Sequence, residues 1–236
     1  MSGEGQDPGR AREPRAGEIT RIVHQQRNPE RVSIYIDGEF AFGLPATEVV
    51  SRGLQRGQRL TLAQATELAA VDEGSRATDA AIQFLSHRPR SEREVRDRLR
   101  KRQYSEAAIE IAIEKTRGWG YINDESFAEF WVENRMRHRP RGARLLSQEL
   151  RQKGVDREVI EQVLEETDLN EHSAALELAR KRLPRLANLE PDVRKRRLSD
   201  YLARRGYGWD VIRPVLNDVL GDDGGSAEPD ADIQAI

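Results

Sequence analysis

One pattern of apolar positions occurs three times between residues 76 and 220. The copies are centred on Leu99, Leu150 and Leu202, which lie 51 and 52 residues apart. In each copy the positions 4 before and 5, 9, 10, 13 and 14 after that leucine are also apolar. The position 4 before the leucine shares one helix face with it, and the last four positions form the apolar stripe of a second helix. The pattern therefore predicts a helical repeat in three copies.

The turn between these two helices holds residues that commonly end one helix and begin the next. Equivalent positions have accepted N-cap residue types, namely Ser105, Asp156 and Gly208. Two residues earlier, Gly154 and Gly206 fit the left-handed position that ends a helix, where the first copy has Gln103. Because a side chain is strained in that conformation, we expect Gln103 to cost some stability.

Each copy also has a helical segment upstream, at residues 76–86, 124–137 and 170–183. The predicted repeats therefore occupy residues 76–120, 121–168 and 169–220, with three helices in each. A unit of about 50 residues cannot bury its apolar face alone. We expect the three repeats to stack in an elongated arrangement.

The residues before the repeats follow a strand pattern. Apolar and polar residues alternate on both sides of Asp37-Gly38, a dipeptide that favours a type I′ hairpin turn. Residues 19–23 add a third strand, and short helices are predicted from Pro45 to about Ser51 and from Leu62 to Val71. The fold class is therefore mainly α, with a small N-terminal β-hairpin or three-strand element and short helices at residues 18–74. Residues 1–17 and 221–236 have few apolar side chains, so we expect both to be disordered.

Composition limits the classes of function. Apolar residues make up 37% of the 236, charged residues 34%, and the mean hydropathy is −0.77, which favours a helical protein with much surface. No apolar run reaches the length of a membrane span, and no leader pattern begins the chain. We therefore expect a cytoplasmic monomer with no membrane partner.

The residues that could carry catalysis or bind metal are absent or scattered. The chain has no cysteine, which excludes disulfides and thiol chemistry. Its four histidines lack metal-ligand spacing, and there is no phosphate-cradling glycine loop or nucleophile elbow. The sequence predicts no metal, no cofactor and no enzymatic activity.

Charge is segregated along the chain. Residues 76–213 hold 30 Lys and Arg against 24 Asp and Glu, a net charge of +6, while the whole chain is at −2. Residues 217–236 hold six acidic residues and no basic one. A basic body indicates an anionic partner.

Basic groups recur near the junction of the first and second helices of each repeat. For a single group, a solvated salt-bridged face is the alternative interpretation, but a stack would align the groups as a stripe. Arginine predominates, which suits bidentate contact with phosphate or carboxylate. The candidate contact residues are Arg88, Arg90, Arg137, Arg139, Arg141, Arg144, Lys153, Arg194, Lys195, Arg196, Arg197, Arg204 and Arg205.

A group of aromatic residues lies between the first two repeats: Trp119, Tyr121, Phe127, Phe130 and Trp131. These rings could stack bases, but the helical spacing from Phe127 to Trp131 favours packing in the core. We expect the core role for this group.

Four segments resemble the RecX family. They are residues 90–95 (RSEREV) leading to Leu99, residues 118–128 (GWGYINDESFA), residues 142–150 (GARLLSQEL) and residues 152–155 (QKGV). The resemblance covers residues 76 to about 220. Departures are Asn123, where the family has an acid, and Pro184, Pro191 and Pro214 in the third copy. The N-terminal strands and the acidic tail are interpreted as additions to the family pattern.

The resemblance implies a regulator of the RecA recombinase. Such a protein binds the filament of RecA on single-stranded DNA and modulates its ATPase and strand exchange, with inhibition expected. The implied partners are the RecA filament and, as a further candidate, single- or double-stranded DNA. The alternative is a stand-alone DNA-binding helical-repeat protein that uses the same arginines without RecA.

The acidic tail yields one test. If it occupies the basic stripe transiently, truncation after Leu220 raises the affinity for DNA or for the filament, because a competing anion is removed. Titration of the truncated and full-length chains against the same labelled strand measures this, and equal affinities would refute the idea.

Overall fold

The computed structural model describes residues 13–26, 28–167 and 169–221. The chain divides into two compact units, Met1–Asn123 and Asp124–Ile236. Most of the residues predicted to be disordered lie outside the described residues. Of the exceptions, Gly17 already begins the first strand, and Arg15 donates to Glu39 at 2.6 Å.

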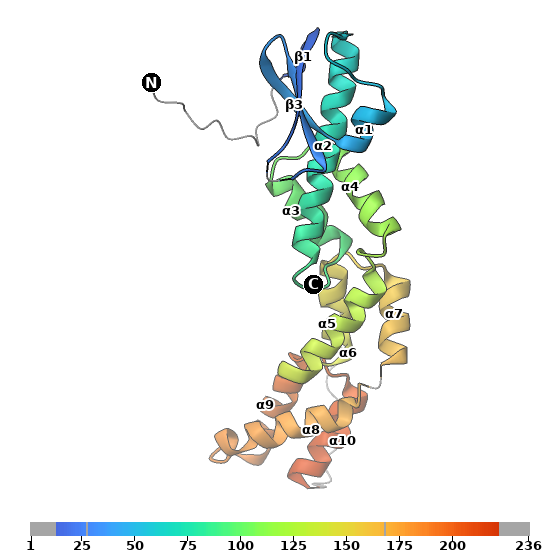
Figure 1. The fold of residues 1–236 in the computed structure, drawn as a ribbon. Helices are drawn as coiled ribbons and strands as arrows, with labels where there is room; N and C mark the ends of the chain where they lie inside the picture. Colours follow the sequence, from blue (N-terminus) through green and yellow to red (C-terminus); the bar gives the residue numbers. More distant parts are fainter. Residues whose placement is uncertain (1–12, 27, 168, 222–236) are drawn as a thin grey trace. The chain divides into compact units, whose positions relative to one another are not determined.

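The first unit begins with an antiparallel sheet (Figure 1). It has four strands in the order β3-β2-β1-β4. Its strands are β1 (Gly17–His24), β2 (Arg31–Ile36), β3 (Glu39–Pro45) and β4 (Arg59–Leu60), and α1 (Ala46–Ser51) follows β3. The predicted hairpin is confirmed, because Asp37 and Gly38 have φ angles of 49° and 85° between β2 and β3. The fourth strand was not predicted, since two residues are too few to show alternation.

Helix α2 (Leu62–Leu85) packs on this sheet and continues into the first repeat. The sequence predicts two separate helices here, at residues 62–71 and 76–86, and that prediction is wrong. Gly74 lies within the helix because α2 and α4 approach closely: a Cβ there would lie 3.0 Å from a side-chain carbon of Ile111. The glycine reflects helix packing, not a break between two helices.

A buried ion pair joins the sheet to α2. Arg31 on β2 donates to Asp72 at 2.5 Å, to Ser75 at 2.6 Å and to the Gly43 carbonyl at 3.2 Å. Burial raises the pKa of the Asp72 carboxyl, while Arg76 and Arg31 oppose that shift. Removing either partner would leave a charge in the interior.

The first repeat consists of the end of α2 with α3 (Glu92–Lys101) and α4 (Glu106–Gly118). Its core holds the template residues Val95, Leu99, Ile109 and Ile113, all at most 1% exposed. Gln103 adopts the left-handed conformation at φ 63°, as the aligned glycines do. The turn therefore has the same backbone conformation in all three copies, although only two of them have glycine at this position.

The second unit contains the other two repeats. The second repeat is α5 (Asp124–His138), α6 (Ala143–Gln152) and α7 (Arg157–Glu166); the third is α8 (Glu171–Arg182), the 3-10 helix η1 (Leu183–Leu186), α9 (Pro191–Ala203) and α10 (Trp209–Leu220). Leu150 and Leu202 are fully buried in their respective cores. Pro184 lies in η1, Pro191 begins α9, and α10 continues through Pro214. No helix in the described ranges is long and apolar enough to cross a membrane.

The central leucine of the second repeat allows a test of core packing. Replacing Leu150 by Ala is expected to lower the free energy of unfolding by about 2–5 kcal/mol, because it leaves a cavity. Chemical denaturation measures the loss, with Val50→Ala as the control, since Val50 is 80% exposed. A loss as small as that of the control would show that Leu150 is not a core residue.

Candidate polyanion-binding surface

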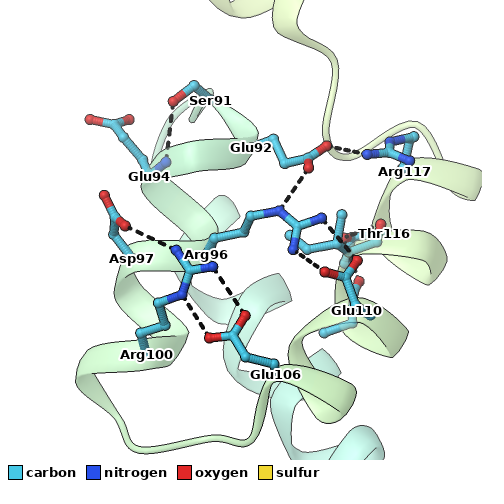
Figure 2. A network of polar contacts seen from close by, with 12 residues as sticks. Ser91, Glu92, Glu94, Arg96, Asp97, Arg100, Glu106, Glu110, Thr116 and Arg117 are labelled. Carbon is cyan, nitrogen blue, oxygen red and sulfur yellow. Dashed lines mark hydrogen bonds and ion pairs between the residues drawn. The ribbon is translucent and has the colours of Figure 1, made fainter. Parts of the chain in front are cut away.

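The arginines of the first repeat are largely paired with carboxylates. Arg96 on α3 bonds Glu92 at 2.8 Å and Glu110 on α4 at 2.6 Å, and Arg100 bonds Glu106 at 2.8 Å (Figure 2). The bond from Arg100 is the largest cause that lowers the pKa of Glu106, and the bond from Arg96 does the same for Glu110. For this repeat the solvated, salt-bridged face is the better interpretation.

The two candidate residues of the first unit also have partners. Arg88 pairs with Glu94 at 3.3 Å and donates to the Pro89 carbonyl at 2.7 Å. The Arg90 guanidinium lies 4.2 Å from the centre of the Phe84 ring, and burial lowers its pKa. Both side chains are half-buried and serve the turn between α2 and α3.

In the second repeat a single glutamate binds several side chains of the surface. Glu149 on α6 accepts from the Trp131 indole and from Arg135, both at 2.8 Å and both on α5. Arg141, in the loop between α5 and α6, also pairs with Glu149. The Glu149 side chain is only 11% exposed. One carboxylate thus fixes two arginines of different segments.

The second and third repeats meet at the start of α6, where two backbone N–H groups bind the third repeat. The Gly142 N–H donates to the Arg205 carbonyl at 2.9 Å, and the Ala143 N–H donates to Glu171 on α8 at 2.7 Å. A Cβ on Gly142 would lie 2.3 Å from the Gly206 carbonyl oxygen. Only glycine fits this approach, which places the start of α6 against the turn between α9 and α10.

This junction brings arginines of both repeats together. Arg141 precedes Gly142, whose N–H binds the carbonyl of Arg205. Burial lowers the pKa of Arg141, and the charges of Arg135, Arg205 and Arg139 lower it further. The predicted candidates Arg139, Arg141 and Arg205 therefore lie within electrostatic reach of one another.

Aromatic rings hold several of these cations. Arg182 and Arg205 lie 5.4 and 5.2 Å from the centre of the Tyr201 ring. Arg135 and Lys153 lie 4.2 and 5.0 Å from the centre of the Trp131 ring. These distances are within the range of cation–π attraction.

The other candidate residues differ in their exposure and in their partners. Within the described ranges, no carboxylate lies in ion-pair distance of the exposed side chains of Arg137, Arg139, Arg144, Arg196, Arg197 and Arg204. Lys195 is half-buried. Arg194 instead donates to the carbonyls of Ala187 and Leu189, at 3.1 and 2.9 Å, so it braces the loop before α9.

The candidate set omitted Arg135, Arg182 and Tyr201. The sequence contains a signal for Arg135 and Tyr201. Trp131 and Arg135 are four residues apart, as are Tyr201 and Arg205. Within a helix that spacing places an aromatic ring and a cation on one face, as for Trp131 and Arg135, whereas Arg205 lies after the last residue of α9. Arg182 comes from another helix, so local spacing does not reveal it.

The core prediction for the aromatic group is partly wrong. Phe127 is fully buried, and Phe130 and Trp131 are half-buried, but Trp119 and Tyr121 are 55% and 57% exposed. Gly120, at φ 76°, turns the chain after α4, and Ile122 takes the buried position. The two exposed rings contact each other edge to face, and their centres are 6.3 Å apart.

Comparisons with known proteins follow the same division of the chain. Family models match in four parts: the RecX regulatory protein N-terminal domain at residues 17–61, and the RecX first, second and third three-helix domains at residues 77–115, 123–164 and 170–216. The three predicted three-helix repeats are confirmed. The interpretation of the N-terminal strands as an addition to the family pattern is wrong, because a model of that family matches them.

Individual relatives cover most of the chain. Regulatory protein RecX of Listeria welshimeri is 34% identical over 83% of this chain and 73% of the relative. The RecX proteins of Bacillus velezensis and Clostridium botulinum are 32% and 31% identical, over 90% and 86% of this chain and 81% and 96% of the relatives.

Two crystal structures are similar to the fold. A regulatory protein RecX has a TM-score of 0.73 and 26% identity, over 85% of this chain and 98% of that one. RecX from Lactobacillus salivarius has a TM-score of 0.58 and 26% identity, over 63% of this chain and 97% of that one.

The junction between the second and third repeats yields a test. Gly142→Ala is expected to lower the free energy of unfolding by about 1–3 kcal/mol, because the new methyl group overlaps backbone that cannot move freely. Gly118→Ala is the control, since a Cβ there meets nothing within 4 Å. Equal thermal stability of the two variants would contradict the close approach.

Proposed function

The chain belongs to the RecX family, and on that premise we propose that it binds the RecA filament on single-stranded DNA and lowers its ATPase and strand-exchange activity. The observation that carries the proposal is the match of four successive family models over residues 17–216. The relatives described above are named regulatory proteins, which agrees with a protein that acts on another.

The repeated architecture suits a polymeric partner. A filament presents the same surface at regular intervals, and three similar units in one chain can each supply a modest contact. Linked contacts bind much more tightly than each does alone, so affinity is high for the filament and low for a free RecA subunit. The predicted stacking of the three repeats would align those contacts.

The charge distribution supports the same partner. A RecA–DNA filament offers phosphates and protein carboxylates, and arginine binds both through paired N–H groups. The exposed arginines of the second unit that lack carboxylate partners in the described ranges are free for such contacts. We expect the protein to act as a cytoplasmic monomer.

The alternative is a stand-alone DNA-binding protein, which the same arginines favour. It would bind naked and RecA-coated strands with comparable affinity and with a steep dependence on salt. Measuring both affinities in one buffer separates the two functions, because a RecA regulator prefers the coated strand.

Three exposed arginines allow a matched test of the proposal. The variant is Arg139→Gln/Arg196→Gln/Arg197→Gln. The concentration required to inhibit RecA ATPase and strand exchange is expected to rise roughly tenfold or more, because each substitution removes a contact with an anion. Arg141 is left intact, since its pairing with Glu149 makes it part of the folded surface.

The control removes the same charge from paired arginines, as Arg100→Gln/Arg117→Gln/Arg157→Gln. Their partners are Glu106, Glu92 and Glu161, so these side chains are engaged within the chain. The control is expected to inhibit like the unsubstituted protein. If the unsubstituted protein at full filament coverage changes neither activity, the proposed function is wrong.

A further inference from the structure

We propose that the junction of the second and third repeats is itself a binding site for the phosphodiester backbone of DNA, built from arginines held by aromatic rings. The inference rests on the proposed function and deepens it, because it names the DNA strand, rather than RecA protein, as the ligand of this junction. Its core consists of Arg135, Arg139, Arg141, Arg182 and Arg205 with Tyr201.

These arginines come from separate segments that the fold brings to one place. Arg135 lies on α5, Arg139 and Arg141 in the following loop, Arg182 at the end of α8 and Arg205 after α9. The bond from the Gly142 N–H to the Arg205 carbonyl connects the loop to the third repeat. Tyr201 then connects Arg205 to Arg182. The result is one continuous set of cations from both repeats.

The positive charge of this set is only partly neutralised. The carboxylates at the junction are Glu149, Glu171 and Asp210, the last beside Gly208 in the turn between α9 and α10. Glu149 pairs with Arg135 and Arg141, whereas Glu171 accepts from the backbone of Ala143 at the start of α6. Within the described residues, no carboxylate lies in ion-pair distance of Arg139, Arg182 or Arg205.

The manner in which Arg182 and Arg205 are held leaves their charge without a neutralising carboxylate. A carboxylate partner orients a guanidinium but cancels its charge and uses its N–H donors, as Figure 2 shows for Arg96 and Arg100 in the first repeat. An aromatic ring orients a guanidinium through its face and leaves the donors at its edge for another acceptor. Tyr201 holds Arg182 and Arg205 in this second manner.

The surface around the junction favours a phosphodiester over a protein partner. Protein interfaces usually contain large apolar side chains at their centre, whereas DNA interfaces are polar and strongly basic. In the described part of the second unit the exposed large apolar side chain is Trp209, which lies beside Asp210 and Asp218 on α10. Phosphates need only cations and N–H donors, which this junction supplies.

The test measures binding of labelled oligo(dT) by fluorescence anisotropy without RecA, over about 50 to 200 mM salt. Arg139→Gln and Arg205→Gln are each expected to reduce the slope of log affinity against log salt by about 0.7, the value for one phosphate contact on a single strand. Arg157→Gln is the control, because Arg157 on α7 is paired with Glu161. It is expected to leave the slope unchanged.

Tyr201 tests the aromatic support separately. Tyr201→Leu keeps an apolar side chain but removes the ring, so oligo(dT) affinity is expected to fall roughly two- to tenfold. Tyr201→Phe keeps the ring and is expected to bind like the unsubstituted protein. Thermal melting checks that each variant is folded, and a duplex of the same length shows which form of DNA the site prefers.

Three results would overturn the inference: no binding of the unsubstituted protein to either form of DNA, slopes unchanged in both arginine variants, or equal affinity of the Leu and Phe variants. RecA ATPase measured on the same variants separates the two proposals. Loss of inhibition with unchanged DNA binding would assign the junction to RecA protein and reject this site. DNA binding as expected with no effect on RecA would reject the proposed function alone.

Discussion

The close approach of Gly142 to the turn at Arg205 and Gly206 is the constraint on which the candidate site depends. No Cβ fits at Gly142, and its N–H is used by the Arg205 carbonyl, so the start of α6 and the end of α9 are held at one distance. Arg141 directly precedes Gly142, and the carbonyl that accepts the bond belongs to Arg205. A backbone contact thus places cations of two repeats together, although like charges alone would separate them.

The three repeats share a core template but use their arginines differently. In the first repeat Arg96, Arg100 and Arg117 pair with Glu92, Glu106 and Glu110, which neutralise their charge within the fold. Aromatic rings hold cations in all three repeats: Phe84 lies against Arg90, Trp131 against Arg135 and Tyr201 against Arg205. The apolar positions determine the repeat, and we propose that the partners of the cations determine which repeat binds an anion.

The sequence predicts the repeats, the hairpin and the left-handed turn positions, because each depends on residues close together in the chain. It does not predict that α2 is continuous, since Gly74 breaks the pattern locally and is explained only by its packing on Ile111. It misplaces Trp119 and Tyr121, whose exposure follows from the turn at Gly120. The arginine cluster depends on a contact between repeats, which local spacing cannot reveal. The end-to-end stacking of all three repeats stays a prediction.

We infer that the Gly142 contact makes the arginines of two repeats into one site. A double-mutant cycle on oligo(dT) affinity with Gly142→Ala and Arg205→Gln tests this most directly. If the contact positions Arg205, then removing Arg205 costs much less affinity once Gly142 is replaced, and the two losses are not additive. Losses that add to within about 0.5 kcal/mol, in variants that remain folded, would contradict it.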